Sequence, residues 1–149
     1  MIMNILLVTS VLMYFSSVQW LTDFEAAKTA AAKEDKYILL NFSGSDWCAP
    51  CIKMKTEVFG NESFLSLAQD RLILVRADFP RSNKNQLMKE QVKHNEALAE
   101  KYNPSGKFPY TLLLDKNGRI LQEWDGYVFG SQERFLAELN NSIARHTYD

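Results

Sequence analysis

Two short apolar runs without a helical period stand in the first half of the chain. Tyr37–Phe42 and Arg71–Asp78 are rich in aliphatic residues and predict two buried strands. The sequence between them predicts one helix that ends near Phe59 and a second over residues 61–68. Strand, helix and strand in this order form a βαβ unit, and its right-handed crossover makes the two strands parallel.

A second pair of strand-like runs follows, with a turn between its members. Lys107–Asp115 and Arg119–Asp125 flank Asn117-Gly118, a dipeptide that is a strong signal for a β-hairpin. The pattern predicts an α/β domain in which the parallel βαβ unit and the antiparallel hairpin share one mixed sheet flanked by helices. The remaining helices are expected over residues 21–36, 86–102 and 131–143.

Two of these helices carry signals for their first turn. Thr22 and Glu25 have the spacing of a capping box, and Ser131 stands where it would cap the last helix. The helix over residues 86–102 is mostly polar, and therefore His94 within it is expected to be exposed.

The composition limits the class of protein. The chain has 149 residues, of which 46% are hydrophobic and 23% charged, enough for one domain with a core and too few for two. Its 17 basic and 18 acidic residues give a net charge of −1, which indicates neither a nucleic acid nor an anionic membrane surface as a partner. We expect one domain over residues 20–149, working as a monomer.

The first twenty residues contain no charged side chain. Ile5–Val8 and Val11–Phe15 form an apolar segment typical of a signal peptide, so residues 1–19 are predicted to direct export to the periplasm or out of the cell. Thr9 and Ser10 leave the continuous apolar span shorter than the ~20 residues that a bilayer needs. Two alternatives stay open: a membrane anchor, and a cytoplasmic protein whose start codon is misplaced or whose first residues form a strand on the domain.

The chemistry of the chain is concentrated in its two cysteines. Cys48 and Cys51 are three positions apart where the first buried strand leads into a helix, and Pro50 suits a helix's first turn. Unpaired N–H groups at a helix N-terminus stabilise a thiolate and lower its pKa from ~8.5 into the range ~3.5–7.5. The spacing therefore predicts a redox dithiol, with Cys48 as the nucleophile and Cys51 as the resolving thiol.

Two other interpretations of the cysteine pair stay open. A structural zinc site needs four Cys or His ligands, but His94 and His146 stand apart from the pair and from each other, so no metal is expected. A purely structural disulfide is the second alternative, although a bridge that closes so short a loop removes little entropy from the unfolded chain.

The motif Trp47-Cys48-Ala49-Pro50-Cys51, the pair Phe108-Pro109, the hairpin and Gly126 together resemble the thioredoxin family. The resemblance covers about Trp20 to Ala144 and implies the thioredoxin fold. It also implies a thiol–disulfide oxidoreductase that needs no cofactor beyond its own cysteine pair.

In the family, one cysteine attacks a protein disulfide and the other resolves the mixed disulfide; Cys48 and Cys51 match these positions. Reduction or isomerisation is expected rather than oxidation, with an unidentified thiol as electron donor. Phe42–Cys48 and Ala77–Pro80 are most similar to single-domain, exported thioredoxin-like proteins of bacterial envelopes. The alternative is a binding or chaperone module of the same fold whose cysteines form a static bridge.

The resemblance further implies a substrate groove beside the dithiol. Trp47 matches an aromatic residue that flanks the active site, and Pro109 matches a proline whose preceding peptide bond is cis. The backbone of Phe108 would then pair with a bound peptide as an added strand, and Gly126 opposite would let the partner's backbone approach. The candidate substrate-binding residues are Trp47, Ala49, Pro50, Phe108, Pro109 and Gly126.

Two positions depart from the family pattern. Thioredoxins carry a buried aspartate that assists proton transfer at the resolving cysteine, and Asn41, the nearest counterpart here, cannot act as a base. Asp46 or Glu57 acting through water is the expected substitute at Cys51. Phe108 is larger than the residues common before this proline, which should alter the choice of partner.

Overall fold

The structure is a computed structural model that describes residues 17–147, so most of the predicted signal segment lies outside the described residues. Among the described residues no helix is long and apolar enough to cross a membrane. In chain order the elements are β1 (Trp20–Leu21), α1 (Phe24–Glu34), β2 (Tyr37–Ser43), α2 (Ala49–Glu57), α3 (Glu62–Arg71), β3 (Leu72–Asp78), the 3-10 turn η1 (Asn83–Asn85), α4 (Lys89–Tyr102), β4 (Tyr110–Leu114), β5 (Ile120–Asp125) and α5 (Gln132–His146).

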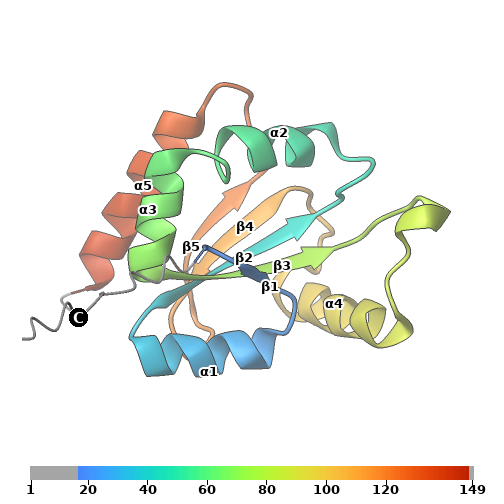
Figure 1. The fold of residues 1–149 in the computed structure, drawn as a ribbon, viewed down its shortest axis with the longest axis horizontal. Helices are drawn as coiled ribbons and strands as arrows, with labels where there is room; N and C mark the ends of the chain where they lie inside the picture. Colours follow the sequence, from blue (N-terminus) through green and yellow to red (C-terminus); the bar gives the residue numbers. More distant parts are fainter. Residues whose placement is uncertain (1–16, 148–149) are drawn as a thin grey trace, which may run out of the picture.

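The strands form one mixed sheet in the order β1-β3-β2-β4-β5 (Figure 1). β2 pairs in parallel with β3, where Asn41 lies opposite Arg76, and antiparallel with β4, where Asn41 lies opposite Thr111. β4 and β5 form the antiparallel hairpin. The predicted βαβ unit and hairpin are confirmed. β1 was not predicted, and it adds a two-residue parallel edge strand in which Trp20 lies opposite Leu74.

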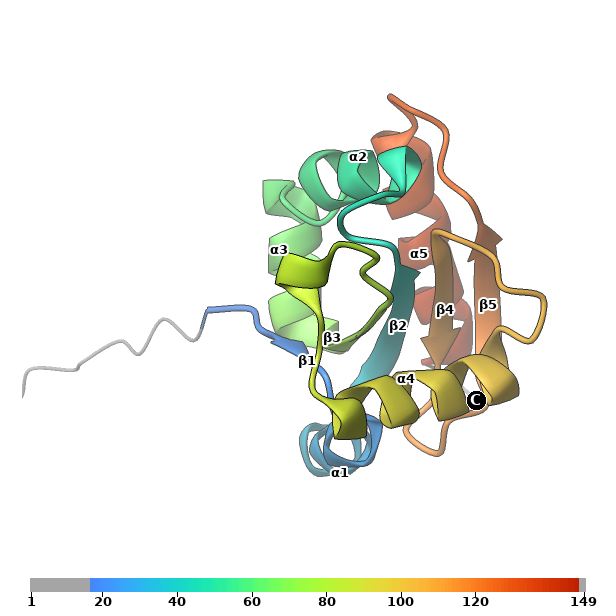
Figure 2. The ribbon, with the colours of Figure 1, turned by 90° about the vertical axis from the view of Figure 1, so that its right-hand side faces the viewer.

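Helices cover both faces of the sheet (Figures 1 and 2). α1 and α4 pack on one face, and α2, α3 and α5 pack on the other. β2 is the central strand and is buried on both faces: Ile38, Leu40 and Phe42 point toward α1 and α4, while Leu39 points toward α2, α3 and α5. Burial on both faces explains why this run is apolar without a clean alternation.

The beginning of α1 differs from the prediction. Asp23, not Thr22, is its N-cap, and the Asp23 carboxylate accepts the N–H of Ala26 at 3.1 Å. Both residue types cap helices well, and the chain enters the helix one residue later than the capping-box spacing suggested. His94 is also not simply exposed, because it is half-buried and its Nε2 accepts the N–H of Phe24 at 3.2 Å. A side chain from α4 therefore satisfies a free amide of α1.

Two further helix starts differ in detail. Ser131 is at the N-cap of α5, but its hydroxyl donates to the Val128 carbonyl at 2.6 Å and makes no capping bond to the helix. α4 begins at Lys89 rather than near Gln86, because residues 79–88 form a long loop with a single 3-10 turn. This loop runs beside the segment that joins β2 to α2 and helps to build the site described below.

Candidate active site

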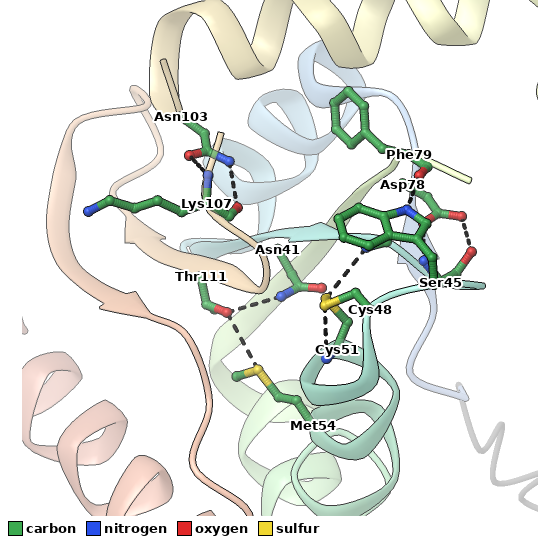
Figure 3. Close-up of a disulfide and its surroundings, with 12 residues drawn as sticks. Asn41, Ser45, Cys48, Cys51, Met54, Asp78, Phe79, Asn103, Lys107 and Thr111 are labelled. Carbon is green, nitrogen blue, oxygen red and sulfur yellow. Dashed lines mark hydrogen bonds between the residues drawn. A yellow bond between two sulfur atoms is a disulfide. The ribbon is translucent and has the colours of Figure 1, made fainter. Parts of the chain in front are cut away.

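The dithiol lies where β2 leads into α2. Cys48 is the N-cap residue of α2, and its Sγ accepts the N–H of Cys51 at 3.3 Å. The two sulfurs are joined in a disulfide with an Sγ–Sγ distance of 2.10 Å (Figure 3). Pro50 lies in the first turn of α2, as predicted, where its missing N–H leaves no intrahelical bond unmade.

Each sulfur also accepts a hydrogen bond from a backbone N–H group. Cys48 Sγ accepts the N–H of Cys51, and Cys51 Sγ accepts the N–H of Gly44 at 3.5 Å. The two residues are equally buried, with exposed fractions of 5% for Cys48 and 4% for Cys51, so burial does not distinguish the attacking sulfur. Its position in α2 distinguishes the attacking sulfur, because Cys48 occupies the N-cap, where the amides and dipole of the helix favour a negative charge.

Gly44 makes room for the aromatic ring beside the dithiol. A Cβ atom on Gly44 would lie 2.3 Å from the ring of Trp47, and therefore a side chain there would displace the indole. The Trp47 Nε1–H donates to the carbonyl of Phe79 at 2.7 Å, which fixes the orientation of the ring. Trp47 thus joins the loop before α2 to the loop after β3.

The other candidate substrate-binding residues of the sequence lie close to this ring. Phe108 meets Trp47 edge to face, with ring centroids 5.3 Å apart, and the Phe108–Pro109 peptide bond is cis as the resemblance implies. The carbonyl of Pro109 accepts the N–H of Gly126 at 2.9 Å. Gly126 has φ of +79°, and a Cβ there would point into open space, so its backbone conformation rather than crowding favours glycine.

Ala49 belongs to the first turn of α2 and is exposed. Together with Pro50 it separates the two cysteines on the helix, whereas Trp47, Phe108 and Gly126 lie on the loops. The structure therefore gathers all six candidate substrate-binding residues around the carboxyl ends of the two parallel central strands and the start of β4.

The polar side chains that β2 and β4 place under α2 at this end are neutral. Asn41 is 2% exposed and its side-chain amide donates to the hydroxyl of Thr111 at 3.0 Å. That hydroxyl in turn points toward the sulfur of Met54, one turn beyond Cys51 on α2, at 3.8 Å (Figure 3). Asn41, the nearest counterpart of the family's buried aspartate, is thus a hydrogen-bonded amide, and among the described residues no ionised side chain bonds to either cysteine sulfur.

Asp46, one expected substitute for the missing carboxylate, holds a loop in place. Its carboxylate accepts the N–H groups of Arg81 and Ser82 and the side-chain amide of Asn85, each at 2.9 Å. These bonds, the one from Arg81 first, hold the pKa of Asp46 below its usual value. Its oxygens are occupied by the loop after β3 and make no bond to Cys51.

Glu57, the other expected substitute, is also engaged elsewhere. The hydroxyl of Tyr127 and the N–H of Gly130 both donate to its carboxylate, and they hold its pKa below the usual value. The pKa of Tyr127 is raised, by burial and by the same bond. Glu57 therefore fastens the loop before α5 to the end of α2, and it makes no bond to a cysteine sulfur.

Sequence reasoning missed one residue at the site. The guanidinium carbon of Arg81 lies 3.7 Å from the centroid of the Trp47 ring. The contact joins two loops that are far apart in the chain, and no motif marks it. The contact is evident only in the folded structure, where Asp46 binds the loop that carries Arg81. Within residues 17–147 no cluster of three or more His, Cys, Asp or Glu side chains is arranged to hold a metal ion.

Comparisons with known proteins agree with this geometry. The sequence model of the family described as thioredoxin-like matches residues 19–115. A protein of Chlamydia pneumoniae named "Disulfide bond reductase DsbH" is 30% identical over 128 residues, which are 86% of this chain and 74% of that protein. A second protein of this organism, "Thioredoxin-related protein DsbJ", is 28% identical over 104 residues, which are 69% of this chain and 29% of that protein.

Solved structures show the same fold. The structure titled "DsbH Oxidoreductase" has a TM-score of 0.74 and 25% sequence identity, and the match covers 95% of each chain. The solution structure of a thioredoxin from Thermus thermophilus has a TM-score of 0.56 at 21% identity and covers 84% of this chain and 86% of that chain. The expected fold, a mixed sheet between two layers of helices, is confirmed.

Proposed function

The chain belongs to the thioredoxin-like family and is a thiol–disulfide oxidoreductase, and on this premise we propose that it acts as a reductase of protein disulfides. The observation that carries the exchange chemistry is the position of Cys48 at the N-cap of α2, where its sulfur accepts the N–H of Cys51. The name of the C. pneumoniae relative, a disulfide bond reductase, supports the same direction of exchange.

The first step is attack by the Cys48 thiolate. Its sulfur bonds to one sulfur of the substrate disulfide, the substrate's S–S bond breaks, and one substrate thiolate leaves. The amides at the N-terminus of α2 stabilise the attacking thiolate before the reaction. The product of this step is a mixed disulfide between Cys48 and the substrate.

The second step regenerates the Cys48–Cys51 bridge. Cys51 gives up its proton, its sulfur attacks Cys48, and the second substrate thiolate leaves with the electron pair. Since Asn41 is not a base and the carboxylates of Asp46 and Glu57 are held by loops, we propose that the departing substrate thiolate takes the proton. The substrate gains two electrons, the protein loses two, and a thiol donor outside the chain must reduce it again.

The surroundings of Cys48 are proposed to bind the substrate chain. Phe108 would offer its backbone to an extended peptide, Trp47 would flank the peptide, and Gly126 would let its backbone approach. No cofactor besides the cysteine pair takes part in these steps. The apolar segment within residues 1–19 supports export, and we propose the periplasm or the cell exterior as the place of work.

Reduction of insulin by dithiothreitol tests the assignment of the two cysteines. The wild-type protein should accelerate the reaction, and Cys48→Ser should leave only the rate of dithiothreitol alone. Cys51→Ser should still attack, and should accumulate a mixed disulfide that alkylation and mass spectrometry place on Cys48. A mixed disulfide formed through Cys51 in Cys48→Ser, or wild-type turnover in either variant, would contradict the assignment.

A single turnover separates reductase from isomerase. Reduced protein is mixed with an excess of a disulfide-bonded substrate without any other thiol, and its cysteines are alkylated after the reaction. A reductase ends with Cys48 and Cys51 joined and the substrate reduced. Recovery of the protein in its dithiol form together with a rearranged substrate would indicate isomerisation instead.

A further inference from the structure

The side chain of Arg81 lies over the ring of Trp47, the residue next to Cys48. Its guanidinium carbon is 3.7 Å from the centroid of the Trp47 ring, and Trp47 immediately precedes Cys48 in the chain. Phe108, whose backbone is proposed to hold the substrate, meets the same ring edge to face. A peptide that reaches Cys48 along this ring therefore passes close to a positive charge.

The backbone of Arg81 is held in place before a substrate arrives. Its backbone N–H donates to one oxygen of Asp46, while Ser82 and Asn85 donate to the other. Asp78, at the start of the same loop, accepts the backbone N–H and the hydroxyl of Ser45. The loop that carries Arg81 is thus fastened to the loop before the dithiol, and an arginine held in this way loses little freedom on binding.

The charge of Arg81 is not neutralised by the protein. Among residues 17–147 no carboxylate oxygen lies within 4.0 Å of its guanidinium, whereas Arg119 and Arg134 each pair with a carboxylate four positions away. Asp46, the acidic residue that touches its backbone, already accepts three hydrogen bonds from the loop. Arg81 is exposed as a residue, and so its charge is available to a partner.

We propose that Arg81 determines substrate specificity, by selecting protein disulfides in which Asp or Glu stands next to a cysteine. A guanidinium presents donors in a planar fork that matches a carboxylate, and stacking keeps that fork at the ring of Trp47, the residue that precedes Cys48. The inference rests on the proposed function only in that Cys48 exchanges with peptide cysteines. The preference holds in whichever direction the exchange runs.

Two matched peptides test the proposal. Each is a symmetric disulfide dimer of one cysteine peptide, identical except that Asp or Lys flanks the cysteine. The second-order rate of exchange with reduced protein is measured for both peptides, and the Asp-to-Lys ratio of each variant is divided by that of the wild type. This division cancels the intrinsic difference in reactivity between the two peptide thiols.

The variants are Arg81→Gln, Arg81→Glu and, as a control, Lys84→Glu. Lys84 is exposed, lies in the same loop, and makes no hydrogen bond or ion pair within the described residues. Lys84→Glu therefore changes the net charge by as much as Arg81→Glu does. Because exposed ion pairs are weak, we expect Arg81→Gln to lower the Asp-to-Lys ratio about two- to fivefold. Arg81→Glu should lower it further, and Lys84→Glu should lower it less than Arg81→Gln does.

The reverse reaction separates this proposal from the reductase proposal. Oxidised protein is mixed with the reduced Asp and Lys peptides, and the same ratios are measured. An unchanged ratio in both Arg81 variants, or an effect of Lys84→Glu as large as that of Arg81→Glu, overturns the role of Arg81 whichever direction is faster. Exchange that runs only toward oxidation of the peptides, with the ratios changing as expected, supports Arg81 and overturns the reductase.

Discussion

The two faces of β2 differ most at the end that leads into the dithiol. On the face covered by α1 and α4, Ile38, Leu40 and Phe42 are fully buried among apolar side chains along the whole strand. On the face covered by α2, α3 and α5, Leu39 is followed by Asn41, whose buried amide donates to Thr111. β2 therefore contributes only apolar side chains to the core on one face, whereas on the other face it places the neutral amide of Asn41 beneath the redox site.

The comparison separates what stabilises the fold from what serves the chemistry. Full burial of a large apolar side chain contributes about 1.5–3 kcal/mol, whereas a satisfied buried hydrogen bond contributes only about 0.5–1.5 kcal/mol. The apolar face of β2 is thus expected to carry most of the strand's contribution to stability. The polar face is expected to matter less for stability and more for the ionisation of the cysteines.

Truncation on the apolar face should give the largest loss of stability. Phe42→Ala removes a fully buried ring that packs near Tyr110, and we expect the free energy of unfolding to fall by about 3–5 kcal/mol in urea titrations. Phe129→Ala is the matched control, because Phe129 is 56% exposed and its loss should change stability by less than about 0.5 kcal/mol. Equal losses in the two variants would contradict the comparison.

A charge on the polar face should cost less and should depend on pH. In Asn41→Asp, burial raises the pKa of the new carboxyl above its unfolded value of about 3.9. The free energy of unfolding should then fall as the pH rises past about 4, and should level off only above the folded pKa. At neutral pH we expect a loss of about 1–3 kcal/mol, measured by urea titration at several pH values.

Asn95→Asp is the matched control for that variant, because Asn95 is equally buried but lies on α4, on the opposite face. Both variants should lose stability with rising pH. Only Asn41→Asp should raise the pKa of the Cys48 thiol, since a nearby negative charge disfavours the thiolate. Alkylation rates against pH measure this pKa. The same rise in Asn95→Asp would show that a charge at position 41 has no particular influence on the pKa of Cys48.

The smallest effect is expected at the exposed rim of the site. The hydrogen bonds from Arg81, Asn85 and Ser82 hold the pKa of Asp46 below its usual value, so they stabilise the fold above the unfolded pKa of about 3.9. That stabilisation is lost as the pH falls through the lower folded pKa. The difference in urea midpoint between wild type and Asp46→Asn should therefore shrink between pH 7 and pH 2.

Asp70→Asn provides the comparison for this experiment, because Asp70 is exposed and makes no hydrogen bond or ion pair within the described residues. It should leave the urea midpoint nearly unchanged at both pH values. A midpoint difference for Asp46→Asn that stays constant from pH 7 to pH 2 would rule out the ionised carboxylate as the group that fastens the loop.

The features that were predictable from the sequence are those with a short-range signal. β2 and β3 are apolar runs, the hairpin has its Asn117-Gly118 turn, and Cys48 and Cys51 have a spacing that places both at the start of a helix. Each of these depends on residues that are neighbours in the chain, so local pattern and turn chemistry suffice to find it.

The features that were missed depend on contacts between distant segments. β1 has two residues and forms only because β3 offers a free edge, so it carries no periodic pattern. His94 was expected to be exposed because its neighbours are polar, yet the packing of α4 brings it to the amide of Phe24. Arg81 contacts Trp47 from a loop that Asp46 binds. Such partners are fixed by tertiary structure, and no local rule identifies them.

The central claim is that the Cys48 thiolate is stabilised by the amides of α2 above the neutral amide of Asn41, and that this moderate stabilisation suits a reductase. Equilibration of the Cys48–Cys51 pair in dithiothreitol and glutathione buffers, with alkylation of Cys48 against pH on the same sample, tests it most directly. We predict a potential near or below ~−250 mV and a Cys48 pKa near ~7. A potential near ~−120 mV with a pKa near ~3.5 would contradict the claim and indicate an oxidant.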